Sequence, residues 1–172
     1  MRSCWFGPAL AVAYLTYAGL AVARDRDEEP DPVIFRIALA DSPVTLQAGM
    51  AAGAHQGRPV SARFEMPDGD LQLAVFTATR SGFVETILDP KGGVVISTAQ
   101  VTDADDLAEA IAQKAAMERA TVPLVAATER AIEESPGSRA VSVVPELRNG
   151  HPVAMVTLQQ SKTFVTVLEG LD

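Results

Sequence analysis

Cysteine and histidine are the scarcest reactive residues of this 172-residue chain, which has one cysteine, Cys4, and two histidines, His55 and His151. A single cysteine forms no intrachain disulfide, so packing must stabilise the fold. The spacings Cys-x-x-Cys and His-x-x-x-His, which supply ligands to many metal sites, do not occur. The pair Gly92-Gly93 is not part of a Gly-x-x-x-x-Gly-Lys-Ser/Thr phosphate loop. The sequence therefore predicts no bound metal and no cofactor.

Aromatic and basic residues are also few. Aromatic residues make up 5% of the chain, which disfavours a stacking platform for sugars or bases. Lys and Arg number 14 against 22 Asp and Glu, which gives a formal net charge of −8. Nucleic acid and anionic lipid repel an acidic surface, so we expect neither as a partner.

The N-terminus has the pattern of an export signal. Met1-Arg2-Ser3 is a short positive start, Trp5–Val22 is uncharged and mostly apolar, and Ala21-Val22-Ala23 suits a signal peptidase. We expect residues 1–23 to be a signal peptide cleaved after Ala23, and residues 24–43 to be a charged linker and lead-in. The mature protein would then be periplasmic or secreted, without stable membrane insertion. The alternative is an uncleaved anchor, because the apolar run is close to the roughly 20 residues that span a bilayer.

The chain repeats itself at an offset of 81 residues. Val60-Ser61 matches Val141-Ser142, and Phe83-Val84 matches Phe164-Val165 without a gap in between. Two dipeptides that suit a tight hairpin turn fall at the same offset: Asp68-Gly69 and Asn149-Gly150. A match of this kind indicates that one supersecondary unit occurs twice.

Within each copy the hydrophobic period changes from helical to alternating. Residues 45–56 and 122–134 read as helices. The inward face of the first has Leu46, Met50 and Ala54, and that of the second has Leu124, Ala127 and Ala131. Residues 60–66 then alternate as a strand. Two more strands follow in each copy, and Val94-Val95-Ile96 can extend the first copy as a short fourth strand. Between the copies, the acids from Asp103 onwards favour the start of a helix that ends near Ala120.

The predicted fold class is α+β, with two tandem repeats of a helix followed by a three-stranded antiparallel sheet. We place the first repeat at 44–98, a connecting helix at 99–120 and the second repeat at 121–172. A unit of this size buries too little surface to be stable alone. Both copies should therefore share one cooperative core, and Phe83 and Phe164 are expected in it.

The order of these features resembles the PepSY family. In the first copy the resemblance rests on Gly57–Glu65, Asp68-Gly69, Phe83–Glu85 and Asp89–Gly93, and in the second on Glu146–Pro152, which lacks the closing Asp-x-x-x-Gly turn. The resemblance implies an exported or membrane-associated α+β module, for which a peptidase-inhibiting or protein-binding role has been proposed. It carries no catalytic residues to this chain.

Five polar residues on the two matching strands are the candidate binding residues: Ser61, Arg63, Glu65, Ser142 and Glu146. Their alternation with apolar neighbours predicts that they lie on the solvent side of the sheet. The serines have no base specified near them that would make them nucleophiles. Glu65 and Glu146 either pair with Arg63 or form part of a shared binding surface.

Two function classes are compatible with these features. The first is an exported, non-catalytic protein-interaction module that offers a sheet face or edge to an envelope or secreted protein, such as a peptidase. The second is a periplasmic carrier of a small ligand or metal in a groove between helix and sheet. An enzyme is disfavoured, because no acid-base pair on a common framework is evident.

Overall fold

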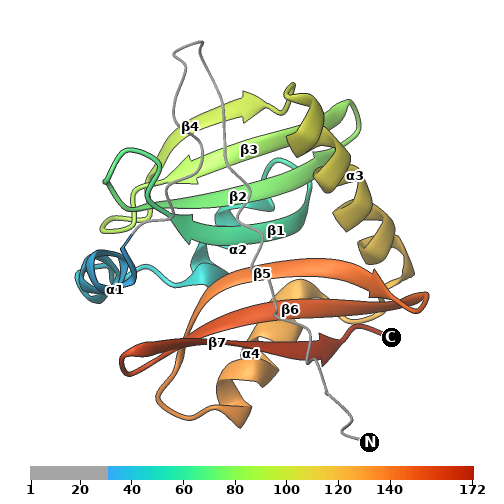
Figure 1. Cartoon of the computed structure of the whole chain (residues 1–172). Helices are drawn as coiled ribbons and strands as arrows, with labels where there is room; N and C mark the ends of the chain where they lie inside the picture. The colour runs from blue at the N-terminus through green and yellow to red at the C-terminus, as the bar shows by residue number, and fades with distance from the viewer. Residues whose placement is uncertain (1–30) are drawn as a thin grey trace, which may run out of the picture.

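The computed structural model describes residues 31–172, so the expected signal peptide lies outside the described residues. The described part is an α+β fold of four helices and seven strands (Figure 1). In chain order the elements are α1 Pro32–Ala40, α2 Leu46–Gly53, β1 Arg58–Glu65, β2 Gln72–Thr79, β3 Gly82–Leu88, β4 Val95–Gln100, α3 Ala104–Arg119, α4 Leu124–Glu134, β5 Arg139–Arg148, β6 His151–Gln160 and β7 Thr163–Gly170.

All seven strands form one antiparallel sheet in the order β4-β3-β2-β1-β5-β6-β7. The expectation of two repeats, each with its own three-stranded sheet, was therefore wrong. The two expected sheets are joined because β1 and β5 pair with each other. A strand left at an edge has unpaired backbone groups, and their pairing removes two such edges. Periodicity within a strand does not reveal which edges will meet.

The junction between the two halves of the sheet is its shortest ladder. Between β1 and β5 only Ala62↔Val143 and Arg63↔Ser142 are in register, whereas β1 and β2 are paired from Arg58 to Glu65. Helix α3 contacts both β1 and β5 and so bridges the junction. The connection between the halves therefore depends on packing as well as on strand pairing.

A second bridge is made by Arg139 at the start of β5. Its guanidinium donates hydrogen bonds to the carbonyls of Leu39, of Ser42 at 2.8 Å and of Val44 at 2.7 Å. It also lies over the ring of Phe64, 4.8 Å from the centroid. This one side chain fixes the segment between α1 and α2 against the opposite half. Burial lowers the pKa of Arg139.

The two predicted hairpins differ in length. Arg148 pairs with His151, so Asn149 and Gly150, with φ of 52° and 86°, form a two-residue turn of the predicted type. The β1–β2 ladder ends at Glu65↔Gln72, so Asp68-Gly69 lies within a longer loop. The chain reverses at both dipeptides, as predicted, but the predicted tight turn is present only at Asn149-Gly150.

Helices α2 and α4 lie side by side behind the sheet and enclose the main core (Figure 1). Gly49 and Gly53 let α2 approach β2 closely, because a Cβ on these glycines would lie 2.4 Å from Leu73 Cδ2 and 2.5 Å from Val75 Cγ1. The buried helix residues include the predicted ones: Leu46, Met50, Leu124, Ala127 and Ala131. Ala54, which was also expected to face inward, follows the end of α2 and is exposed.

One apolar core runs through both halves, as the sequence predicted. Phe83 is buried within it, whereas Phe164 is half-buried beside Phe35 of α1, with the ring centroids 5.7 Å apart. The connecting helix is present as α3, where Asp103 accepts hydrogen bonds from the first-turn amides of Asp105 and Asp106. Among the described helices, none is both long and apolar enough to cross a bilayer.

Candidate functional site

The five predicted binding residues lie on β1 and β5, the two strands that meet at the centre of the sheet. Arg63 is directly paired with Ser142, so the structure brings these two together. Because the strands run antiparallel, Glu65 and Glu146 lie towards opposite ends of the junction. The five residues therefore do not form one cluster.

Two of the five are buried, contrary to the expectation of a solvent-facing row. Ser61 is 4% exposed and its hydroxyl donates to Gln113 Oε1 of α3 at 2.8 Å. Arg63 is 6% exposed, forms an ion pair with Glu65 at 2.7 Å, and lies over the ring of Phe76. Burial of a charged group is tolerated when it is paired in this way. These contacts give Ser61 and Arg63 a structural role beneath α3.

The two glutamates form local pairs. Glu65 accepts a second hydrogen bond from Gln72 Nε2 at 2.6 Å, and Glu146 pairs with Arg148 on the same strand. The pairing of Glu65 with Arg63, one of the two alternatives for this residue, is thus what the structure contains. Both carboxylates are half-buried rather than open.

Buried acidic residues that were not predicted from the sequence lie on β3 and α3. Glu85 of β3 is 1% exposed and pairs in register with Phe76, and Asp106 of α3 is 4% exposed. The pKa of Glu109 on α3 is raised overall. Partial burial is the main cause and Asp106 and Asp105 add to it, whereas Arg63 acts in the opposite direction. Helix α3 thus covers a polar layer on β1, in which Ser61 is bonded to Gln113 and Arg63 lies close to acidic residues of the helix.

The histidines do not form a metal site with the acids. His151 Nδ1 lies 2.7 Å from Asp172 Oδ2, both side chains are exposed, and the hydrogen bond from His151 lowers the pKa of Asp172. His55 is exposed just after α2. Within residues 31–172 no group of three or more His, Cys, Asp or Glu side chains could hold a metal ion.

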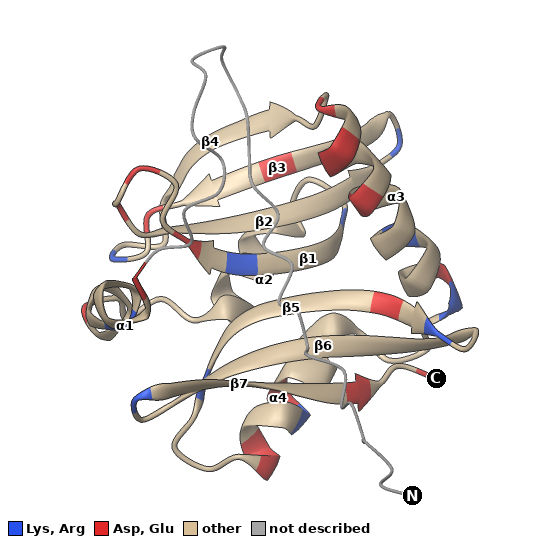
Figure 2. Ribbon diagram, viewed as in Figure 1, with Lys and Arg blue, Asp and Glu red and all other residues tan. Residues whose placement is uncertain are grey.

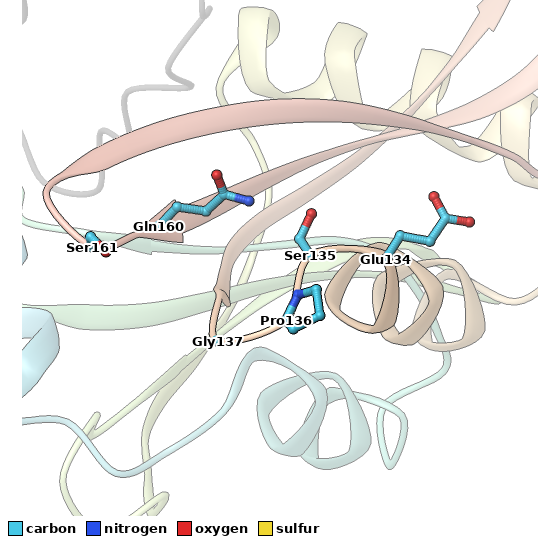
Figure 3. Close-up of a pocket in the computed structure, with 6 residues that line it drawn as sticks. All are labelled: Glu134, Ser135, Pro136, Gly137, Gln160 and Ser161. Atoms are coloured by element: carbon cyan, nitrogen blue, oxygen red, sulfur yellow. The ribbon is translucent and has the colours of Figure 1, made fainter.

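A hollow of about 430 Å³ lies beyond the end of α4, against the β6–β7 turn (Figure 3). Its lining is one carboxylate, one amide, two hydroxyls and a Pro-Gly turn, from Glu134, Gln160, Ser135, Ser161, Pro136 and Gly137. Ligand sites are usually concave and mostly apolar, with a few convergent polar groups. This open, polar hollow differs from that description, and it does not lie in a groove between helix and sheet.

Among the helices and strands of residues 31–172, the edge strand β4 is the most exposed. Every residue from Val95 to Gln100 is exposed, and Val94 and Ile96 are 66% and 64% exposed. The strand is uncharged, as Figure 2 shows, while acidic residues gather at the start of α3 beyond it. Exposed apolar side chains on an open edge are a feature that native proteins usually avoid.

The hydrogen-bond pattern defines which backbone groups of β4 face outward. Val101 N–H donates to the carbonyl of Phe83 at 2.9 Å, and these two residues come directly after the partners Val84↔Gln100 and so continue the β3–β4 register. Antiparallel pairs alternate between hydrogen-bonded and non-hydrogen-bonded. Ala99 and Ser97 therefore bond towards β3, and the N–H and C=O groups of Thr98 and Gln100 point away from the sheet.

No family model matches the chain, and no significant match exists among curated proteins or solved structures. The likeness to PepSY domains therefore rests on the sequence features alone.

Proposed function

We propose that this protein is a non-catalytic interaction module that binds an extended segment of another protein along the open edge of β4. The observation that carries the proposal is the combination of exposure and backbone geometry in this strand. Thr98 and Gln100 direct backbone donors and acceptors outward, where no other strand of residues 31–172 pairs with them, and an added strand satisfies them by main-chain hydrogen bonds. Side chains on both sides of the edge then provide specificity.

A polypeptide fits this edge better than other ligands. Backbone donors and acceptors repeat along a strand at intervals that only another extended chain reproduces. The side chains of β4 are β-branched, small or amide, without a charge that would have to be desolvated. The acidic net charge of the chain favours basic segments as partners.

Binding without catalysis agrees with the chemistry of the described residues. Ser61, the buried candidate serine, donates its hydroxyl to Gln113, and the half-buried Ser142 lies beside Arg63. The contact between His151 and Asp172 is exposed at the surface. Neither place combines a base, a nucleophile and an enclosed position for a substrate.

The expected location of the partner follows from the N-terminal sequence. A cleaved signal peptide would place the protein in the periplasm or outside the cell, where an envelope or secreted protein is the available partner. A peptidase is one candidate, because proteases bind extended segments in their clefts and the PepSY resemblance points the same way. In that case the protein should inhibit the peptidase without being consumed at the rate of a substrate.

Site-specific photocrosslinking in the native cell tests the proposal. A photoreactive side chain at Ile96 should give an adduct with one different protein, and the same group at Leu168 of β7, which is 48% exposed, should not. Adding Thr98→Pro, which removes an outward N–H and no bond to β3, should abolish the adduct. Absence of a foreign protein from the Ile96 adducts, or an adduct that persists with Thr98→Pro, would overturn the proposal.

A further inference from the structure

We infer that, when no other protein is bound, the β4 edge pairs with the β4 edge of a second copy of this chain. The inference builds on the proposed function, because it concerns the same edge and makes the second copy a competitor of the partner. A twofold pair of this kind is isologous, with the same residues contributed by both copies.

The outward backbone groups set the centre of such a pair. In an antiparallel arrangement the outward-facing residue Thr98 can lie opposite Thr98 of the second copy, and both then exchange N–H and C=O bonds. This register places Ile96, which lies in the bulge between the pairs Ile87↔Ser97 and Leu88↔Val95, opposite Gln100. Threonine pairs across strands are favourable, and no like charges face each other along the strand.

The charges that flank β4 favour the same arrangement. The exposed Lys91 precedes the strand, and the exposed Asp105 follows it at the start of α3. An antiparallel pair places the start of β4 in each copy beside the end of β4 in the other, so the Lys91 side of one copy lies towards the Asp105 side of its partner, whereas a parallel pair would place like ends together.

The strand also has the composition of a self-pairing segment. From Val94 to Val101 it is uncharged, contains no Pro or Gly, and is rich in β-branched residues. Exposed edges of this composition readily pair with other strands. A defined dimer satisfies this tendency in a closed assembly of two copies and leaves neither β4 edge open.

Disulfide trapping tests the register directly. Partners in a hydrogen-bonded antiparallel pair have Cα atoms about 5.5 Å apart, within the range that a disulfide spans. In the full chain with Cys4→Ser, Thr98→Cys should therefore form a covalent dimer under mild oxidation. Thr166→Cys, at an outward-facing position of β7, is the matched control and should remain monomeric. A monomeric Thr98→Cys variant, or equal trapping at Thr166, would overturn the inference.

Sedimentation equilibrium of the native chain gives the second measurement. Thr98→Pro should raise the dissociation constant of the dimer by about tenfold or more, since each copy loses a donor at the twofold axis. Lys91→Glu and Asp105→Lys should each weaken the dimer by about twofold to fivefold, and combining them should restore it. A native chain that is monomeric throughout, a dimer insensitive to Thr98→Pro, or a charge reversal that is not rescued would contradict the inference.

These outcomes are distinct from those of the proposed function. Crosslinking at Ile96 to a different protein, together with a monomeric native chain, would leave the proposed function standing and remove only the self-pairing. Dimers without any foreign adduct would do the reverse.

Discussion

The two outermost strands of the sheet differ in what covers their outer side. The outward carbonyl of Gly170 in β7 accepts a hydrogen bond from Arg130 of α4 at 2.6 Å. At the other end, Arg36 of α1 donates to the carbonyl of Lys162, just before β7. At the opposite edge of the sheet, all residues of β4 are exposed.

The helices that contact the β7 side of the sheet edge are remote from it in sequence, as α1 is, or separated from it by two strands, as α4 is. Arg36 of α1 reaches the turn before β7, and Arg130 of α4 reaches the carbonyl of Gly170 at the end of the strand. The chain leaves β4 directly into α3, which packs on the central strands instead. An edge that is left uncovered while the opposite one is protected is the better candidate for recognition.

The largest expected effect on the free energy of unfolding comes from the loss of Arg139, which fixes the segment between α1 and α2. Arg139→Met removes the bonds to the carbonyls of Leu39, Ser42 and Val44 and leaves these acceptors without that donor. We expect a loss of about 3 to 5 kcal/mol of unfolding free energy, measured in denaturant.

The matched control for this variant is Arg119→Met. Arg119 is exposed and donates one bond, to the carbonyl of Gly150 at 3.2 Å, so its loss should cost about 1 kcal/mol or less. Hydrogen exchange should also accelerate at the start of β7 in Arg139→Met, because α1 is less firmly held. Equal stability of the two variants would show that Arg139 is not an anchor.

The second effect tests the orientation of β4. Ala99→Pro removes an N–H that bonds to β3 and should cost about 1 to 3 kcal/mol. Thr98→Pro removes an outward N–H and should cost less than about 1 kcal/mol. Thermal or denaturant unfolding of the two variants measures the difference. A larger cost for Thr98→Pro would mean that the N–H of Thr98, and not that of Ala99, bonds to β3.

The third effect is the opening of the β7 edge, which should then be exposed in the same way as β4. Arg130→Met removes the bond to Gly170 and the ion pair with Glu169 at 3.5 Å, at a cost of about 1 kcal/mol. The opened edge should then give crosslinks from a photoreactive group at Leu168. Lys114→Met, which breaks an exposed pair on α3, should give none. Unchanged crosslinking in Arg130→Met would mean that Arg130 does not protect the edge.

The cost of Arg130→Met should also depend on pH. Burial raises the pKa of Glu169, Glu134 raises it further, and Arg130 lowers it. Arg130 stabilises the ionised carboxylate, so its removal should cost most above the pKa of Glu169 and less as the pH falls through that value. Unfolding curves at several pH values would reveal this dependence.

Local features of the fold could be predicted from the sequence, whereas the pairing of its halves could not. The helical faces with Leu46 and Leu124 and the turn at Asn149-Gly150 depend on neighbouring residues, and the structure has them as predicted. The single sheet depends on β1 meeting β5, which brings Arg63 and Ser142 together from distant parts of the chain. Periodicity carries no information on that contact.

The candidate site was misjudged for the same reason. Alternation assigned Ser61 and Arg63 to solvent, but α3 covers that side of β1, so both sides of this central strand are buried. Conversely, Val95 and Ile96 are apolar and suggest burial, yet they lie at an uncovered edge. The sequence signal that was available is an uncharged segment without Pro directly after a turn, which is typical of a strand that can pair with another chain.

The smallest expected effect concerns α3, the helix that continues from β4 and covers the polar layer. Partial burial raises the pKa of Glu109 from its ordinary value of 4.5, so the folded chain holds this carboxylate in its charged form at a cost. As the pH rises, Glu109 therefore loses its proton at a lower pH in the unfolded chain than in the folded chain. Stability therefore falls as the pH rises from about 4.5 through the raised pKa and is then constant.

Glu109→Gln should remove that fall and stabilise the protein at neutral pH by less than about 0.5 kcal/mol, with no gain below the ordinary pKa. Glu118→Gln, at the surface near the C-terminal end of α3, should have the opposite sign, because the hydrogen bond from Lys114 lowers the pKa of Glu118. Parallel unfolding series from acidic to neutral pH would compare the two variants. If Glu109→Gln destabilised the protein at neutral pH, its carboxylate would be a favourable partner of Arg63 and α3 would be held to the sheet by attraction rather than at a cost.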